Sequence, residues 1–210
     1  MTTIHRRERG FGRFLPSIML LACLAATGAQ ADLAGTGLRG WKIEEGVDDP
    51  SYAVVEPTTT NLNIDTVVLA CEGTGEARVL QLQLYLADDR PLQPKASAGQ
   101  LKDDPRAEIS IDGRTFPATL LFADDYVVLA DGQRGRYPML SHRLISAMQT
   151  GKTMVLRFDL IAKRPGQPPT FDGEAVVDLR APGGRDAIAA MRRCAQAEGR
   201  SRIGSAMLRH

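Results

Sequence analysis

Cys71 and Cys194 are the residues of this chain with the clearest chemistry. A third cysteine, Cys23, lies in a segment with the features of an export signal, so we do not count it with the folded body. No Cys-x-x-Cys spacing occurs in the chain, which makes a redox-active pair the least favoured reading. In an exported chain a structural disulfide between Cys71 and Cys194 is favoured over two separate buried thiols.

Ser141 and His142 are adjacent, which suggests a nucleophile and its base. Adjacent residues of a helix point in different directions, so we interpret Ser141 as a polar residue near a helix start and His142 as a solvated side chain. His5 lies in the export segment and His210 ends the chain, so His142 is the only histidine expected in the folded body. This count excludes a multi-histidine zinc site and a two-histidine acid–base mechanism.

Four aspartate pairs could place carboxylates on loops, where Ca²⁺ binds. None of them has the spacing of a calcium loop, and aspartate is also common in turns because it bonds its own backbone. A pair of carboxylates for glycoside cleavage stays open, but no pair is singled out. We therefore expect no catalytic residue, no metal site and no cofactor. The pairs are Asp48-Asp49, Asp88-Asp89, Asp103-Asp104 and Asp124-Asp125.

Residues 1–31 have the three parts of a cleaved secretory signal. Four arginines precede a short apolar stretch over 14–26, and Ala29-Gln30-Ala31 supplies the small residues that a signal peptidase reads. The apolar stretch is too short to be a stable membrane span. The sequence therefore predicts a mature chain that starts at Asp32 and a periplasmic or secreted location.

Two other export routes remain as alternatives. Arg6-Arg7 could belong to a twin-arginine signal, although the residues that follow fit it poorly. Leu20-Leu21-Ala22-Cys23 could be a lipoprotein cleavage box with Cys23 as the lipidated residue, although bulky Leu21 and the apolar run after Cys23 argue against it.

The net charge limits the classes of partner that the chain could attract electrostatically. The whole chain has a formal charge of +1, and removal of 1–31 takes away four arginines and one glutamate. The nearly neutral remainder offers little electrostatic attraction to nucleic acid. No later segment is long and apolar enough to be predicted as a transmembrane helix.

Alternating side chains predict most of the strands. In 79–86 the leucines at 80, 82, 84 and 86 alternate with Val79, Gln81, Gln83 and Tyr85, so the leucines share one sheet face. Residues 153–161 alternate in the same way, with Arg157 and Asp159 opposite the apolar side. The remaining strands are predicted at 51–55, 63–71, 109–111, 116–122, 126–129 and 171–179, with a hairpin turn at Asp112-Gly113 and loops over 88–106 and 164–169.

Two helices are predicted among these strands. The first spans 138–149, and Gly151 follows as its C-terminal cap. The second spans 186–197, with Asp186 at its positive end and Cys194 on its apolar stripe. Strands joined by short turns predict a mainly β (β-rich α+β) fold: an antiparallel β-sandwich or partly open barrel whose C-terminal helix is disulfide-linked to the sheet. The expected domain spans 32–197, and 198–210 is expected to be a disordered basic tail.

The order of these features resembles two groups of small exported bacterial proteins. An early tryptophan (Trp41), a strand that ends in cysteine (67–71) and an alanine-rich helix that closes on cysteine (187–194) are the features in common. The chain is similar in this spacing to the type VI secretion-associated periplasmic proteins and to the invasion-associated locus B proteins. The resemblance implies a disulfide-bearing β-rich domain without known catalysis.

We therefore expect a non-enzymatic exported protein that binds another protein or an envelope component. The aromatic residues Trp41, Tyr52 and Tyr126 are the predicted binding residues, although each could also belong to the core. A carrier of a small apolar ligand, with the leucine faces of 79–86 and 153–161 lining a cavity, is the alternative. A hydrolase without a recognisable motif comes third. The sequence gives no indication of oligomeric state.

Overall fold

Ten strands form one antiparallel sheet in the computed structural model, which describes residues 40–73, 78–96, 99–123, 125–164, 166 and 170–196. The side chain of Cys194 is not among the parts described. In their order across the sheet, the strands are β1 (Lys42–Ile43), β2 (Tyr52–Val55), β4 (Ile64–Glu72), β5 (Val79–Leu86), β8 (Tyr126–Ala130), β7 (Arg114–Phe122), β6 (Leu101–Ile111), β11 (Thr153–Ile161), β12 (Gly173–Asp178) and β3 (Thr59–Thr60).

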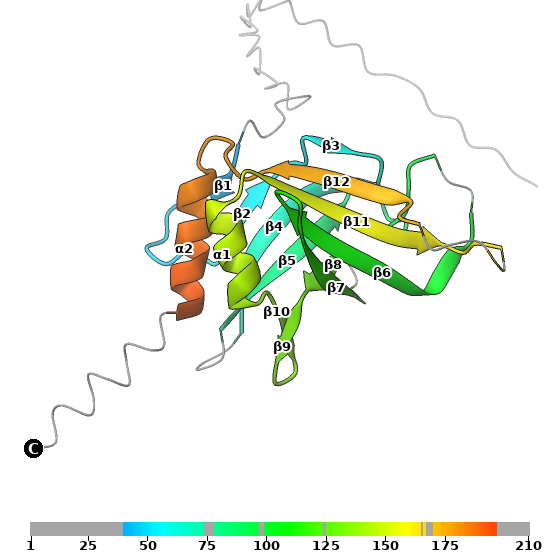
Figure 1. Ribbon diagram of the computed structural model, residues 1–210. Helices are drawn as coiled ribbons and strands as arrows, with labels where there is room; N and C mark the ends of the chain where they lie inside the picture. The colour runs from blue at the N-terminus through cyan, green and yellow to red at the C-terminus, as the bar shows by residue number, and fades with distance from the viewer. Residues whose placement is uncertain are drawn as a thin grey trace, which may run out of the picture. The chain divides into compact units, whose positions relative to one another are not determined.

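The sheet curls into a half-barrel (Figure 1). Only residues 56–58 separate β2 from β3, yet these two strands pair with β4 and β12, near opposite ends of the strand order. The segment 52–60 therefore pairs with strands near both ends of the strand order, which requires the sheet to curve strongly. The predictions of a mainly β chain and of antiparallel pairing are confirmed.

The leucine-bearing face of the sheet forms the core. Leu80, Leu82 and Leu84 are each at most 1% exposed, and Leu156 and Phe158 of β11 are fully buried in the same cluster. Burying one such side chain stabilises the fold by roughly 1.5–3 kcal/mol. The period-two pattern thus identified the bounds of β5 and β11 and the face of each that turns inward.

The prediction of a loop over 88–106 is wrong for its last six residues. Residues 101–106 belong to β6 and pair with β11, while the pairing of β6 with β7 begins only at Ala107. Pro105 is tolerated here because this part of β6 has a strand on one side only. We predicted a loop because proline and the neighbouring acidic residues are uncommon in strands.

A hairpin precedes the first helix and shortens it. β9 (Gly132–Arg134) and β10 (Tyr137–Met139) pair with each other, so Pro138 and Met139 are not helical as predicted. Helix α1 (His142–Thr150) begins after Ser141, whose hydroxyl oxygen accepts the Leu144 N–H at 3.2 Å as an N-cap. The predicted turn at Asp112-Gly113 is present, and both residues have positive φ, 48° and 85°.

Both helices pack at one side of the curled sheet. Leu144, Ile145 and Met148 form the buried face of α1, as their spacing predicts. Helix α2 (Gly184–Gln196) has Asp186 in its first turn and contacts α1, β1, β2, β4 and β5 (Figure 1). In the described residues no helix has the length and apolarity needed to cross a membrane. The predicted signal over 1–31, Cys23 and the tail over 198–210 lie outside the described residues.

Candidate functional site

The outer side of β2, β4, β5 and β8 carries aromatic and aliphatic side chains. Alternation turns these residues away from the leucine core, and the cross-strand register brings them together: Val54 lies opposite Val68, and Tyr85 lies opposite Tyr126. We call the surface formed by Tyr52, Val54, Val68, Tyr85 and Tyr126 the tyrosine face.

A hollow of about 560 Å³ lies on the tyrosine face. Val54 and Val68 line it, and Tyr52 and Tyr85 are 42% and 37% exposed beside it. The ring of Tyr85 stacks on that of Tyr126, with 5.3 Å between centroids and 25° between planes. The chain has four tyrosines, and three of them lie on this one face. An outer face of an antiparallel sheet is usually polar, so this concentration marks a candidate binding surface.

Carboxylates surround the tyrosine face. Asp65 and Glu72 line the hollow, and Asp125 immediately precedes β8. Partial burial raises the pKa of Tyr85, and the neighbouring Tyr126, Glu72 and Asp125 raise it further. The Tyr85 hydroxyl therefore stays protonated at neutral pH, beside two carboxylates that raise its pKa.

Two buried glutamines of β5 make side-chain hydrogen bonds beside the hollow. Gln81 Nε2 donates to the carbonyl oxygen of Pro138 at 2.9 Å, which ties β5 to the β9–β10 hairpin. Gln83 Nε2 donates to Glu72 Oε1 at 3.1 Å. These bonds satisfy polar groups on an otherwise apolar surface and fix the position of Glu72.

The predicted binding residues do not all lie on this surface. Tyr52 and Tyr126 do, whereas Trp41 is 5% exposed, belongs to the core cluster and donates from Nε1 to the carbonyl oxygen of Asp178 at 3.1 Å. The position of Trp41 therefore indicates a structural role. Sequence reasoning did not select Tyr85, which lies on the tyrosine face, although its place opposite the leucines of the same strand was the available signal.

A second cluster of polar residues surrounds Asp159 on the outer side of β11. Its Oδ2 lies 2.6 Å from Lys102 Nζ and 2.9 Å from the Arg106 guanidinium, and its Oδ1 lies 2.9 Å from Lys163 Nζ. Its side chain is only 2% exposed, because the three basic side chains cover it. Burial by itself would raise the pKa of Asp159, but the hydrogen bonds from Lys102, Lys163 and Arg106 outweigh it and hold the pKa well below its ordinary value.

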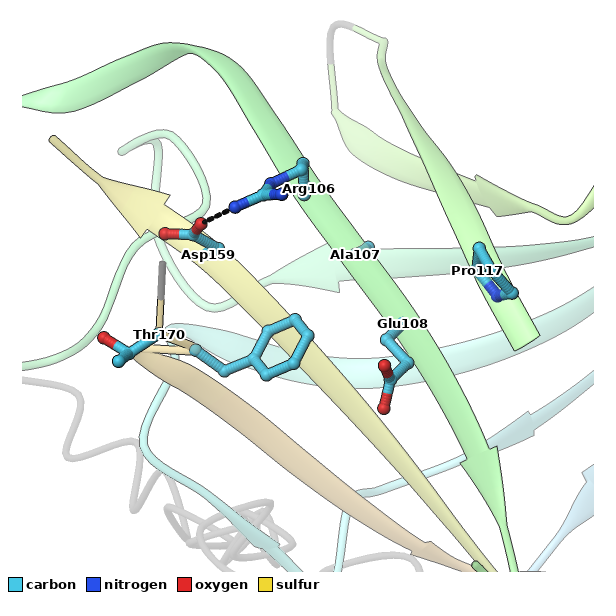
Figure 2. A pocket seen from close by; sticks show the side chains of 7 residues that line it. Arg106, Ala107, Glu108, Pro117, Asp159 and Thr170 are labelled. Atoms are coloured by element: carbon cyan, nitrogen blue, oxygen red, sulfur yellow. Dashed lines mark hydrogen bonds and ion pairs between the residues drawn. The ribbon is translucent and has the colours of Figure 1, made fainter. Parts of the chain in front are cut away.

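A shallow hollow of about 250 Å³ lies next to this cluster and is lined by Arg106, Glu108, Pro117 and Asp159, as Figure 2 shows. Its charged groups pair within the chain. The Arg106 guanidinium donates a hydrogen bond to Asp159 Oδ2. Glu108 Oε1 lies 3.5 Å from Arg157 Nη1, as an ion pair. We interpret this region as an ion-pair cluster that fastens β6 to β11 and to the segment after β11.

Two of the other candidates from the sequence, Ser141 and Asp88, have local structural roles. The Ser141 hydroxyl caps α1 and lies 2.5 Å from Asp131 Oδ2. Hydrogen bonds from the Arg90 guanidinium and from Asn63 lower the pKa of Asp88 to about 2, as expected of an aspartate that orders a turn. Among the described residues, no three histidine, cysteine or acidic side chains gather as metal ligands would; Asp124 is not one of these residues.

Comparison with known proteins returns no matching protein-family model, no matching curated protein and no matching solved structure.

Proposed function

We propose that this chain is an exported, non-catalytic protein that binds a protein partner or a component of the bacterial envelope through the tyrosine face. The observation that carries the proposal is the hollow with exposed Tyr52 and Tyr85 beside it on a rigid sheet. Tyrosine supplies large contact area at a low cost in side-chain entropy, and it is enriched among the residues that dominate binding energy at protein interfaces.

The two outer halves of the sheet differ in a way that supports this choice. Around Asp159 the charged groups have partners within the chain. On the tyrosine face, within the described ranges, the hydroxyls of Tyr52, Tyr85 and Tyr126 have no hydrogen-bond partner. A surface with aromatic bodies and free polar ends can gain both contact area and hydrogen bonds on association.

Crosslinking in intact cells tests this proposal. A tagged chain with Tyr52→Ala and Tyr85→Ala should lose a crosslinked partner that the unaltered chain recovers reproducibly. Phe171→Ala is the matched control, because Phe171 is 47% exposed in the segment before β12, does not line the hollow of the tyrosine face, and should leave recovery unchanged. The proposal fails if the unaltered chain recovers no reproducible partner, or if the double variant recovers it equally well.

Export and a disulfide between Cys71 and Cys194 belong to the same proposal. Cys71 packs against the core cluster and lies opposite Leu80, whose side chain is 1% exposed on the core side of the sheet. Helix α2, which carries Cys194, contacts β4, which carries Cys71. Non-reducing peptide mapping of protein from the periplasm should find the two cysteines in one linked peptide, and unmodified thiols would refute the pairing.

The alternative of an apolar-ligand carrier receives less support. The leucines of β5 and the apolar residues of β11 that would line a cavity pack together in the core cluster. The hollow of about 560 Å³ opens on the outer face instead. The resemblance to secretion-associated periplasmic proteins and to the invasion-associated locus B proteins stays a prediction, which the identity of a recovered partner would test.

A further inference from the structure

We infer that the tyrosine face recognises a basic segment of a partner protein, whose arginine or lysine side chains lie over the tyrosine rings and pair with the surrounding carboxylates. This inference depends on the proposed function, because it names the chemistry of the partner that the tyrosine face would bind. Three observations carry it: the charge around the face, the arginine pairing of other rings in the same chain, and the exposure of the rings themselves.

The charge around the tyrosine face is mainly negative. Asp65 and Glu72 line the hollow, whose lining includes no lysine or arginine, and Asp125 adds a negative charge near Tyr85. Lys42 of β1, opposite Val54, is a basic group on the same side. An anionic partner would meet these carboxylates with repulsion, and a purely apolar one would bury some of them unpaired, which costs free energy.

Other aromatic rings of this chain already have an arginine partner. The guanidinium of Arg114 lies 5.3 Å from the ring centroid of Phe116, with that of Arg143 at 5.7 Å. The guanidinium of Arg136 lies 5.2 Å from the ring of Tyr137. These distances are within the range of cation–π attraction.

The rings of the tyrosine face have no such partner among the described residues. Tyr52 and Tyr85 are the two most exposed tyrosines of this face, and Asp65 and Glu72 line the same hollow. A partner arginine placed over a ring could therefore make a cation–π contact and an ion pair at once. A cation–π contact alone contributes about 0.5–1 kcal/mol when exposed and about 2 kcal/mol when desolvated.

Fluorescence anisotropy with simple peptides tests the inference on the processed, oxidised chain purified from the periplasm. The probes are labelled octa-arginine, octa-lysine and octa-glutamate. We expect octa-arginine to bind most tightly, octa-lysine more weakly and octa-glutamate not at all. Tyr52→Leu with Tyr85→Leu should raise the Kd for octa-arginine by about tenfold, since two exposed cation–π contacts are lost.

A second pair of variants separates this site from general attraction between opposite charges. Glu72→Gln with Asp125→Asn should raise the Kd by about threefold or more, because two carboxylates beside the rings are lost. Asp103→Asn with Asp104→Asn removes the same charge from exposed positions on β6 and should leave the Kd unchanged. The inference would be overturned if the two double carboxylate variants changed the Kd for octa-arginine equally, or if the tyrosine changes left that Kd unchanged.

The remaining outcomes distinguish the inference from the proposed function. If crosslinking in cells recovers a partner that depends on Tyr52 and Tyr85 while octa-arginine does not bind, the basic chemistry is wrong and the binding function stands. If octa-arginine binds only after removal of 198–210, the face is occupied by the chain's own basic tail, and recognition of a separate partner is refuted. If the tyrosine changes dissociate a dimer of the chain in light scattering, the occupant is a second copy, which also refutes the inference.

Discussion

Replacing Asp159 with asparagine should destabilise the protein by about 3 kcal/mol. The carboxylate accepts hydrogen bonds from Lys102 on β6 and from Lys163 beyond β11, at 2.6 Å and 2.9 Å. Asparagine has nearly the same shape, so the change removes charge with little change in volume. The two lysines would then face each other without the anion between them.

The magnitude follows from the exposure of each partner. The side chains of Lys102 and Lys163 are 21% and 19% exposed, so water replaces only part of what they lose. Arg106 is 57% exposed and regains most of its solvation, so its contribution is small. A hydrogen bond to a charged group contributes roughly 1.5–3 kcal/mol, and two weakened bonds of this kind give the figure above. For a chain of this size the midpoint of thermal unfolding should fall by about 6–12 °C.

The effect of Asp159 should depend on pH with a defined sign. The pKa of this carboxyl is lower in the folded state than in the unfolded state. Its contribution to stability is therefore fully present above the unfolded pKa of about 4, and it is lost as the pH falls toward the folded pKa. The difference in unfolding free energy between the two proteins should be constant from neutral pH down to about pH 5 and should shrink below about pH 4.

Urea unfolding followed by circular dichroism measures this difference. Asp104→Asn is the matched control, because Asp104 is an exposed carboxylate on the same strand as Lys102 and its loss should cost less than about 0.5 kcal/mol. If Asp159→Asn is no more destabilising than Asp104→Asn, the ion-pair cluster does not stabilise the fold and the argument from burial is wrong.

Three further changes test other contacts. Ser141→Ala should cost about 1 kcal/mol in urea unfolding, since the cap of Leu144 N–H is lost, and an unchanged midpoint would contradict the cap. Gly173→Ala should cost roughly 1–3 kcal/mol in thermal unfolding, because a Cβ there would lie 2.5 Å from Leu62 Cδ2; a stabilised variant would show that the site has room. Cys71→Ser should lower the free energy of unfolding by up to about 4–5 kcal/mol if the disulfide closes a loop of about 120 residues. Adding a reductant to this variant should then cause no further loss of stability. A further loss would contradict the pairing.

Local patterns account for the part of the fold that the sequence predicts. Alternation in 79–86 and 153–161 is a property of neighbouring residues, so it identifies the strands and their buried faces without knowledge of their partners. The β9–β10 hairpin escaped prediction because its strands have three residues each and carry no alternation of apolar residues. The start of β6 was not predicted as a strand because Pro105 and the acidic residues beside it favour loops.

The tyrosine face and the Asp159 cluster depend on contacts between residues that are distant in the sequence. Asp159 reads as an ordinary exposed acid on the polar side of its strand, and only the pairing of β11 with β6 shows that Arg106 lies opposite it. The tyrosine face likewise requires the register that sets Tyr85 opposite Tyr126. Residue type alone led us to select Tyr52 and Tyr126, which lie on the tyrosine face, together with Trp41, which lies in the core.

Site-specific photocrosslinking tests the central claim most directly. A photoreactive phenylalanine derivative would replace Tyr52 of β2 in one chain and Phe171, in the segment before β12, in another; the two positions have similar exposure. We expect ultraviolet irradiation of intact cells to produce one reproducible protein adduct from the Tyr52 position and none from the Phe171 position. Adducts of the same pattern from both positions, or from neither, would contradict the claim that the tyrosine face is a binding surface.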